Sequence, residues 1–193
     1  DLVDYDYYAP AMSLPAIVGL DHPQQHVNFP YIKSYVDKYI RVQMDRVAGD
    51  RKKIGVRFYG NPEFEHDQFR TPPREALESL SRYGQLFSLQ LEEQDSPTLP
   101  NCKHLIRDWQ DTYSVFANLD LLVTSCTSTA HLAGAMGIPC IVMVPLVPYF
   151  VWASDSLRWY GDNLTVVRQT RYNDWPEAVV NLKTAVESKL CDR

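Results

Sequence analysis

The segment 119–145 constrains the fold of this chain more than any other part of the sequence. It reads LDLLVTSCTSTAHLAGAMGIPCIVMVP, in which an apolar run and a group of small hydroxyl residues are followed by a stretch of helical periodicity and a second apolar run. Two continuous apolar strands joined by one helix are typical of a βαβ unit whose sheet is covered on both faces. The segment therefore predicts an α/β fold.

The remaining sequence extends this unit into a larger sheet, because further short apolar runs alternate with stretches of helical periodicity. We expect an open, parallel, Rossmann-like sheet of about six strands with helices on both faces. The expected strands are 53–58, 85–90, 102–106, 119–123, 140–144 and 164–168. The expected helices begin near Ser34, Pro73, Asp111, Thr127 or Ser128, and Asn173 or Asp174, the last one running to about Lys189.

Two regions are expected from the distribution of breakers and periodicity. Residues 1–33 are rich in Tyr, Pro and His and are interpreted as an interdomain connector or the remnant of an N-terminal domain. Residues 34–193 are interpreted as the Rossmann-like domain. The first residue is Asp1 and not Met, so a fragment of a longer protein is one interpretation of the chain, which the sequence alone leaves open.

Charge and composition narrow the classes of partner. The net charge is −5 with acids and bases interspersed, so no basic field is available for a nucleic-acid backbone. No apolar run approaches the roughly 20 residues of a membrane span, and no signal peptide is recognisable. The 4 cysteines show no CxxC spacing, which favours reduced thiols in a cytoplasmic protein.

Several common motifs are absent from the sequence. No GxGxxG follows the first expected strand, and neither GxxxxGK[ST] nor GxSxG occurs, which argues against dinucleotide enzymes, P-loop ATPases and simple serine hydrolases. Asp4-Tyr5-Asp6 matches a metal-binding DxD pattern, but so short a pattern arises easily by chance. His22 and His26 are separated by Pro23 and are interpreted as a solvated loop. No metal site is therefore expected.

The hydroxyl-rich turn 124–129 lies where the first apolar strand of the central unit ends and the helix begins. The first N–H groups of a helix have no partner inside it, and the helix dipole favours an anion at this end. The turn is therefore a candidate phosphate-binding site at the carboxyl edge of the sheet. The alternative interpretation is that Thr127 or Ser128 is only an N-cap.

A second candidate group lies in the polar loop 60–73, which follows the first expected strand. Arg70 in this loop could hold a diphosphate through its planar set of donors, because guanidinium groups pair well with phosphate oxygens. The alternative is an ordinary solvated arginine.

The sequence as a whole resembles the C-terminal domain of the heptosyltransferase-like (family 9) GT-B glycosyltransferases, most of all the variants associated with tetratricopeptide repeats. The resemblance covers most of the chain. It is carried by SCTSTAHLAGAMGIPCIVMVP, Tyr149-Phe150-Val151-Trp152, Trp159-Tyr160, Val167-Arg168-Gln169 and Asp174-Trp175. The similarity also covers Ser13-Leu14-Pro15, Pro30-Tyr31, 55–62 and Ser88-Leu89-Gln90.

This resemblance implies the donor-binding half of a two-domain glycosyltransferase, with residues 34–193 holding a nucleotide-diphosphate sugar and an N-terminal domain supplying acceptor and catalytic base. No cofactor and no metal are implied, because the helix dipole and basic side chains neutralise the leaving diphosphate. The substrate-binding residues implied are Arg70 at phosphate, Gln90 near the nucleoside, and Cys126, Thr127, Ser128, Thr129 and His131 around the diphosphate.

Two departures from the family pattern bear on activity. Many members have Asp where this chain has Cys126, so a carboxylate is missing from the phosphate pocket, which could tune the donor or signal lost activity. The acceptor half is not in this sequence, so the chain alone is expected to bind donor weakly at best and to transfer nothing. The alternative function is a non-catalytic nucleotide-binding or protein-interaction module.

Three side-chain roles stay open at this level. His131 fits either a core histidine or a site residue, and the aromatic residues from Tyr149 to Tyr160 fit either ring stacking or packing. Cys126 at a helix start could be a nucleophile with a lowered pKa, but no His/Asp pair stands at a recognisable spacing.

Overall fold

The computed structural model describes residues 4–19, 30–61, 63, 67–92, 99–153 and 160–191. The strands are β1 (Lys53–Arg57), β2 (Gln85–Ser88), β3 (Leu121–Ser125), β4 (Cys140–Val144) and β5 (Leu164–Arg168). The α-helices are α1 (Leu14–Ile17), α2 (Lys38–Ala48), α3 (Asp67–Arg70), α4 (Arg74–Glu78), α5 (Trp109–Ala117), α6 (Ser128–Met136) and α7 (Pro176–Cys191). Short 3₁₀ helices occupy Ala11–Ser13, Ser79–Arg82, Cys102–Leu105, Phe150–Trp152 and Gly161–Asn163. The expectations for His22, His26 and Trp159 concern residues outside the described ranges.

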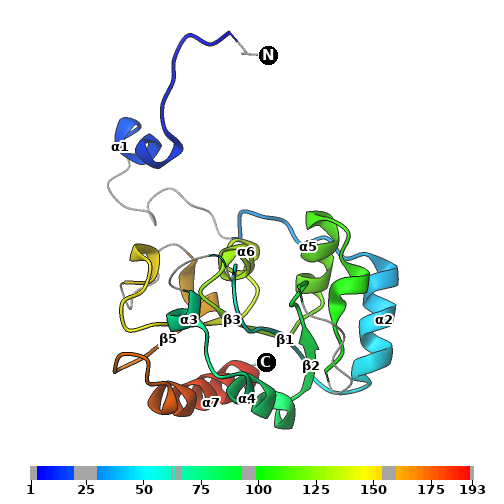
Figure 1. Ribbon diagram of the computed structural model, residues 1–193. Coiled ribbons are helices and arrows are strands. Elements are labelled where there is room, and N and C mark those ends of the chain that lie inside the picture. Colours follow the sequence, from blue (N-terminus) through cyan, green and yellow to red (C-terminus); the bar gives the residue numbers. More distant parts are fainter. Residues whose placement is uncertain are drawn as a thin grey trace.

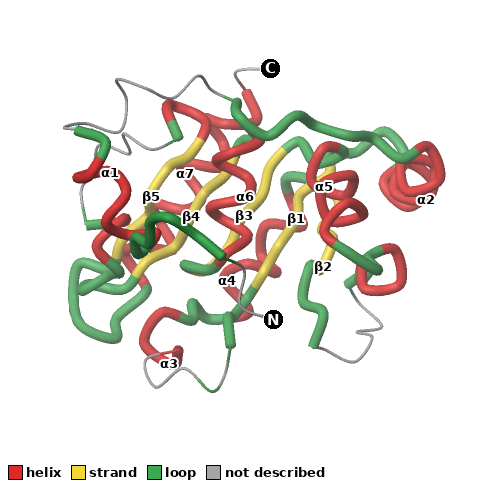
Figure 2. The backbone as a smooth tube through the Cα atoms, turned by 90° about the horizontal axis from the view of Figure 1, so that it is seen from above, coloured by secondary structure: helices red, strands yellow, loops and turns green. Residues whose placement is uncertain are grey.

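The five strands form one parallel sheet in the order β2-β1-β3-β4-β5, which Figure 2 shows from above. The chain winds outward from β1 to β2 and then returns to the other side of β1 at β3. In a sheet wound in both directions, ligands bind beyond the carboxyl ends of the strands, near the point where the winding reverses. The predicted α/β class and open parallel sheet are confirmed, and the described residues form five strands where about six are expected from the sequence.

Helices cover both faces of the sheet, as Figure 1 shows. One core lies under α2, α5 and α6 and includes Leu122 and Val142, while the other lies under α4 and α7 and includes Val123 and Ile141. Neighbouring residues of β3 and β4 thus point into opposite cores, and every residue of both strands is buried. Burial of each large apolar side chain contributes about 1.5 to 3 kcal/mol, which explains why β4 and residues 121–123 of β3 are continuous apolar runs.

The expected third strand at 102–106 is wrong, because Cys102–Leu105 is a 3₁₀ helix. At the sheet edge, Asn101 forms an isolated parallel bridge with Ser88, whose N–H donates to the Pro100 carbonyl at 2.7 Å. There the Asn101 side chain accepts a hydrogen bond from the Lys103 N–H at 2.7 Å and donates to the Gln90 carbonyl at 3.0 Å. A side chain that satisfies nearby backbone groups competes with strand pairing, so the chain turns instead of extending the sheet.

Three predicted helix starts are also corrected. The cap of α2 is Asp37 and not Ser34, because its carboxylate accepts from the Ile40 N–H at 3.0 Å. The cap of α5 is Asp108 and not Asp111, which lies in the first turn and pairs with Arg107. Helix α7 begins at Pro176, whose fixed φ suits a first helical position.

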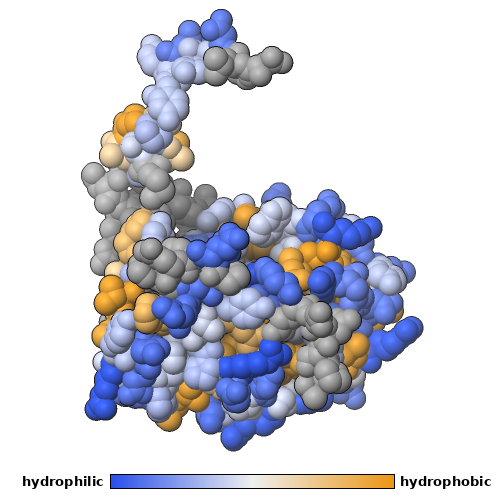
Figure 3. All heavy atoms as spheres, viewed as in Figure 1, coloured by the Kyte–Doolittle hydropathy of each residue, from blue (hydrophilic) through white to orange (hydrophobic). Residues whose placement is uncertain are grey.

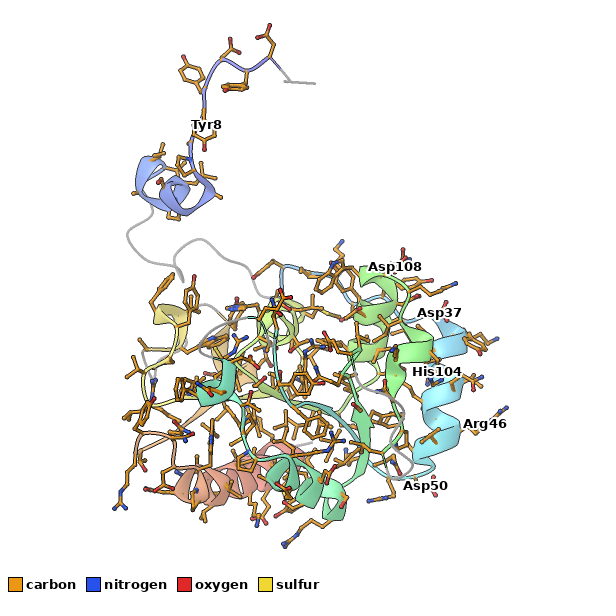
Figure 4. The ribbon with its side chains drawn as sticks, viewed as in Figure 1. Tyr8, Asp37, Arg46, Asp50, His104 and Asp108 are labelled. Carbon is orange, nitrogen blue, oxygen red and sulfur yellow. The ribbon has the colours of Figure 1, made fainter. Side chains whose placement is uncertain are left out.

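The N-terminal segment 4–19 extends away from the sheet, with Tyr8 on its outer part (Figures 1 and 4). Apolar side chains of α1 are exposed there, and they stand out on the surface in Figure 3. Residues after this segment contact the domain directly, because the N–H groups of Tyr31 and Ile32 both donate to the Ala135 carbonyl of α6 at 3.1 Å. Of the described helices, none combines the length and apolarity needed to cross a bilayer.

Candidate functional site

A cavity of about 760 Å³ opens at the carboxyl edge of the sheet, over the ends of β3, β4 and β5. The segments that follow these three strands form most of its wall, and α3 closes one side. Its lining includes five of the seven residues that the sequence singled out, namely Arg70, Cys126, Thr127, Ser128 and His131. Arg70, at the end of α3, and Cys126, after β3, are 56 positions apart in the chain but are in contact at this edge of the sheet.

The start of α6 presents donors to this cavity. Thr127 is the N-cap by position, but its hydroxyl makes no capping bond to the helix. Among the described residues, the N–H groups of Ser128 and Thr129 have no protein acceptor, whereas the Ala130 N–H bonds back to the Thr127 carbonyl. Ser128 is exposed, so this end of the helix is accessible as well as unsatisfied. Such a helix end is suited to an anion.

The Thr127 hydroxyl is held by neighbouring hydroxyl groups and not by a backbone N–H of the helix that it precedes. It lies 2.6 Å from the Thr129 hydroxyl, which lies 2.8 Å from the hydroxyl of Thr124. The Thr124 hydroxyl in turn donates to the Ser125 carbonyl at 2.9 Å. Three hydroxyl groups thus form a chain behind the turn, which fixes the backbone that faces the cavity.

Arg70 is positioned by α3 and reaches across to the start of α6. Its Nη1 donates to the Cys126 carbonyl at 2.9 Å, and its Nε donates to Asp67 Oδ1 at 2.8 Å. The Arg70 side chain is only 18% exposed and that of Asp67 10% exposed, so the pair is poorly screened by solvent. Asp67 holds the guanidinium in place and offsets part of its charge.

Cys126 lines the cavity with a buried thiol. Burial raises its pKa above that of an ordinary thiol, and the nearby charge of Arg70 opposes this only in part. The thiol is therefore protonated near neutral pH, which speaks against a thiolate nucleophile.

His131 is both packed and exposed to the cavity. Its Nδ1 lies 2.7 Å from the Tyr160 hydroxyl, and its ring centroid lies 4.7 Å from that of Trp152. Burial lowers the pKa of His131, so the imidazole is neutral at pH 7. Tyr160 is also hydrogen-bonded to Tyr31, so the histidine is linked through one phenol to the segment before α2.

Gln90 and Thr129 are not brought to the cavity wall. Gln90 is fully buried, its Oε1 accepts from the N–H groups of Phe58 and Tyr59, and its Nε2 donates to Glu92 at 2.8 Å. These bonds hold the backbone that follows β1. Thr129 is buried behind Thr127 in the hydroxyl chain.

The described aromatic residues from Tyr149 onward differ in their degree of burial. Trp152 is 1% exposed and packs against His131, and Tyr160 is buried against α6. Tyr149 and Phe150 are more than half exposed, and their rings contact each other with centroids 4.4 Å apart and planes tilted by 59°. Tyr149 and Trp152 line the cavity together with Tyr172.

Gln169 lines the cavity, although sequence reasoning predicts no role for it beyond its place in the Val167-Arg168-Gln169 block. Its side chain is 1% exposed, and its Oε1 accepts from the Leu146 N–H at 3.1 Å. The signal that could have found it is its position, one residue after the last strand of a parallel sheet.

No group of three or more His, Cys, Asp or Glu side chains in the described part of the chain is arranged to hold a metal ion. No carboxylate occurs among the described residues that line the cavity. The polar groups on its wall are therefore mainly hydrogen-bond donors and hydroxyls.

Comparisons with known proteins support the fold. No family model matches the chain, and no curated protein matches it by sequence. Among solved structures, the chain is similar to the E. coli ADP-heptose LPS heptosyltransferase II, with a TM-score of 0.55 and 12% sequence identity. The match covers 87% of this chain and 56% of that structure, so the chain spans about half the length of the enzyme it resembles. The chain thus has a heptosyltransferase-like fold, a Rossmann-like α/β domain that matches one half of a GT-B glycosyltransferase.

Proposed function

We propose that this chain is the donor-binding half of a glycosyltransferase and binds a nucleotide-diphosphate sugar. The observation that carries the proposal is the meeting of Arg70 with the unsatisfied start of α6 on the wall of one cavity. A diphosphate placed there would accept from the N–H groups of Ser128 and Thr129 and would lie beside a guanidinium that solvent screens poorly. The fold of the heptosyltransferase supports this assignment.

The chemical role of this arrangement is to stabilise a leaving group. Transfer of a sugar from a nucleotide-diphosphate sugar breaks the bond between the sugar and the diphosphate, and negative charge develops on the departing phosphate oxygen. Fixed N–H donors, the helix dipole and Arg70 would stabilise that charge without reorganising. No carboxylate occurs among the lining residues that the structure describes, and we propose that the base acting on the acceptor is supplied by the N-terminal domain of a complete enzyme.

Titration with UDP-, GDP- and ADP-glucose, followed by tryptophan fluorescence and calorimetry, tests the proposal. Trp152 lies on the cavity wall and is a suitable reporter. Arg70→Ala is expected to weaken binding by about 1.5 to 3 kcal/mol, as for a hydrogen bond to a charged group, and Thr127→Val by about 0.5 to 1.5 kcal/mol. Binding of one nucleotide sugar with these losses supports the donor-binding function.

The matched control is Arg46→Ala, which removes the same charge from the exposed surface of α2, far from α3 (Figures 1 and 4). The Arg46→Ala variant should bind the nucleotide sugar with the same affinity as the unmodified chain. A folded chain that binds none of the three nucleotide sugars would contradict the proposal and favour the interaction module instead.

A further inference from the structure

The polar side chain that stands out on the cavity wall is Gln169, at the end of β5. Among the described residues, three buried side-chain nitrogen or oxygen atoms lack a hydrogen-bond partner, and they belong to Arg57, Ser125 and Gln169. Of these three residues, only Gln169 lines the cavity. A buried donor without a partner costs about 1 to 3 kcal/mol, so its retention calls for an explanation.

The orientation of the Gln169 carboxamide is determined by its neighbours. Its Oε1 accepts from the Leu146 N–H at 3.1 Å, and only the oxygen of the amide can play that part. Its own backbone N–H donates to the Val144 carbonyl at 3.1 Å, which fixes the residue against β4. The amide nitrogen is therefore the unsatisfied atom, and it offers hydrogen-bond donors and no acceptor.

The surroundings of Gln169 differ from those of the α6 start. The cavity wall between them is built by the segment after β4, where Pro145, Leu146, Val147 and Pro148 present mainly apolar surface. Strand β4 separates β3 from β5, so the two ends of the cavity lie about two strand spacings, or roughly 10 Å, apart along the sheet edge. That span accommodates a ring next to a diphosphate held at α6.

We propose that Gln169 donates a hydrogen bond from Nε2 to an oxygen or ring-nitrogen acceptor on the organic ring that the diphosphate carries, seated against the apolar segment 145–148. Gln169 is then a specificity-determining residue of the cavity. The inference rests on the proposed function, because the diphosphate at α6 sets where the ring lies. Two parts of a nucleotide sugar offer this chemistry, the base and the sugar.

Binding measurements with three probes test the inference, namely inorganic pyrophosphate, a nucleoside diphosphate and the matching nucleotide-diphosphate glucose, with uridine, guanosine and adenosine series. Gln169→Leu is expected to weaken binding of a ring-bearing probe about three- to tenfold, as for one lost hydrogen bond, and to leave pyrophosphate affinity unchanged. Gln169→Glu keeps an acceptor for the Leu146 N–H but turns a carboxylate oxygen toward the ring. It should therefore weaken binding of a ring-bearing probe more than Gln169→Leu does.

The pattern of losses identifies the ring. A loss for both the nucleoside diphosphate and its glucose conjugate assigns the base, whereas a loss for the conjugate alone assigns the sugar. Gln110→Leu, which removes an exposed glutamine on α5, should behave as the unmodified chain with every probe. Thermal unfolding of each variant shows that the fold is retained.

Two results overturn the inference while the proposed function stands. One is that nucleotide binds the chain and both Gln169 variants bind it as well as the unmodified chain does. The other is an equal loss for pyrophosphate and ring-bearing probes, which would mean a general disturbance of the cavity. If no probe binds the unmodified chain, both proposals fail together.

Discussion

The guanidinium of Arg70 occupies the space that a side chain would need at Gly60. A β-carbon built on Gly60 would lie against Arg70 Nη2 closer than van der Waals contact permits, and 3.0 Å from Asp67 Oδ1. The Gly60 N–H also donates to that Asp67 oxygen at 3.3 Å. The absence of a side chain at residue 60 therefore leaves the space in which the guanidinium lies while it bonds to the Cys126 carbonyl.

This relationship predicts that Gly60→Ala weakens nucleotide binding although residue 60 itself lies outside the cavity lining. The added methyl group must displace the guanidinium, so the expected loss is about 1 to 3 kcal/mol, similar to that of Arg70→Ala. The double variant Gly60→Ala/Arg70→Ala should lose little more than Arg70→Ala alone, because both act on one group. Calorimetric titration of the three variants measures this, and additive losses would refute the shared cause.

Asp67→Ala is predicted to destabilise the fold as well as the cavity. The Asp67 carboxylate accepts from the Gly60 N–H, from Arg70 Nε and from the Thr71 hydroxyl. Removing one partner of a buried pair leaves the other charge uncompensated and costs about 3 to 5 kcal/mol, less where water reaches the site. Urea unfolding should show the loss. Arg41→Ala, which breaks a solvent-exposed ion pair with Asp45, should change the unfolding free energy by less than 1 kcal/mol.

Stability is predicted to fall as the pH is lowered from 7 toward 5, with a contribution from His131. Burial lowers the pKa of His131 in the folded state, so below its ordinary value near 6.5 the unfolded chain binds a proton that the folded chain does not. Protonation of His131 therefore favours the unfolded state, so the free energy of unfolding is full above that pH and decreases as the pH falls below it.

The measurement is urea unfolding at several pH values for the unmodified chain and for His131→Gln. The difference between the two isolates the histidine from the carboxylates that also titrate on acidification. A pH dependence that is identical in both proteins would contradict this assignment.

Gly134→Ala is predicted to destabilise the chain even though alanine is the better helix former. A β-carbon on Gly134 of α6 would collide with the ring of Tyr160, and 2.9 Å would separate it from the Tyr160 β-carbon. Overpacking of this kind costs about 1 to 3 kcal/mol, which exceeds the gain of roughly 1 kcal/mol in helix propensity.

Thermal unfolding of Gly134→Ala measures the net effect. Combining it with Tyr160→Leu, which removes the ring, should recover part of the loss, whereas an increase in Tm for Gly134→Ala alone would show that the ring moves freely. Tyr160→Phe keeps the ring and should not relieve the collision.

Thiol labelling is predicted to modify one cysteine rapidly in the folded chain. Cys191 is exposed, whereas Cys102, Cys126 and Cys140 are buried. Burial raises the pKa of Cys102 to about 12 and also raises that of Cys126, so neither offers an accessible thiolate near pH 8. Mass spectrometry after brief maleimide treatment should find one label, which Cys191→Ser removes. Rapid labelling of Cys126 would reopen its interpretation as a nucleophile.

The sequence alone was enough to predict those parts of this protein that follow from local pattern. The apolar runs of β3 and β4 predict buried parallel strands because both faces of such strands lie in a core, and the hydroxyl turn between them predicts the helix start where the cavity opens. The position of Arg70 near this turn was expected from the family resemblance, and the structure places it there.

The tertiary structure alone decided which groups already have partners. The Gln90 side chain bonds to the backbone after β1, and the Thr129 hydroxyl bonds to other hydroxyl groups. The hydrogen bonds of Asn101 favour a turn where a third strand is expected from the sequence. The Leu146 N–H bonds to the Gln169 oxygen and thereby determines that the unsatisfied atom of this side chain is its nitrogen. Hydrogen-bond saturation depends on atoms distant in sequence that folding brings within about 3 Å, so no local pattern in the chain records it.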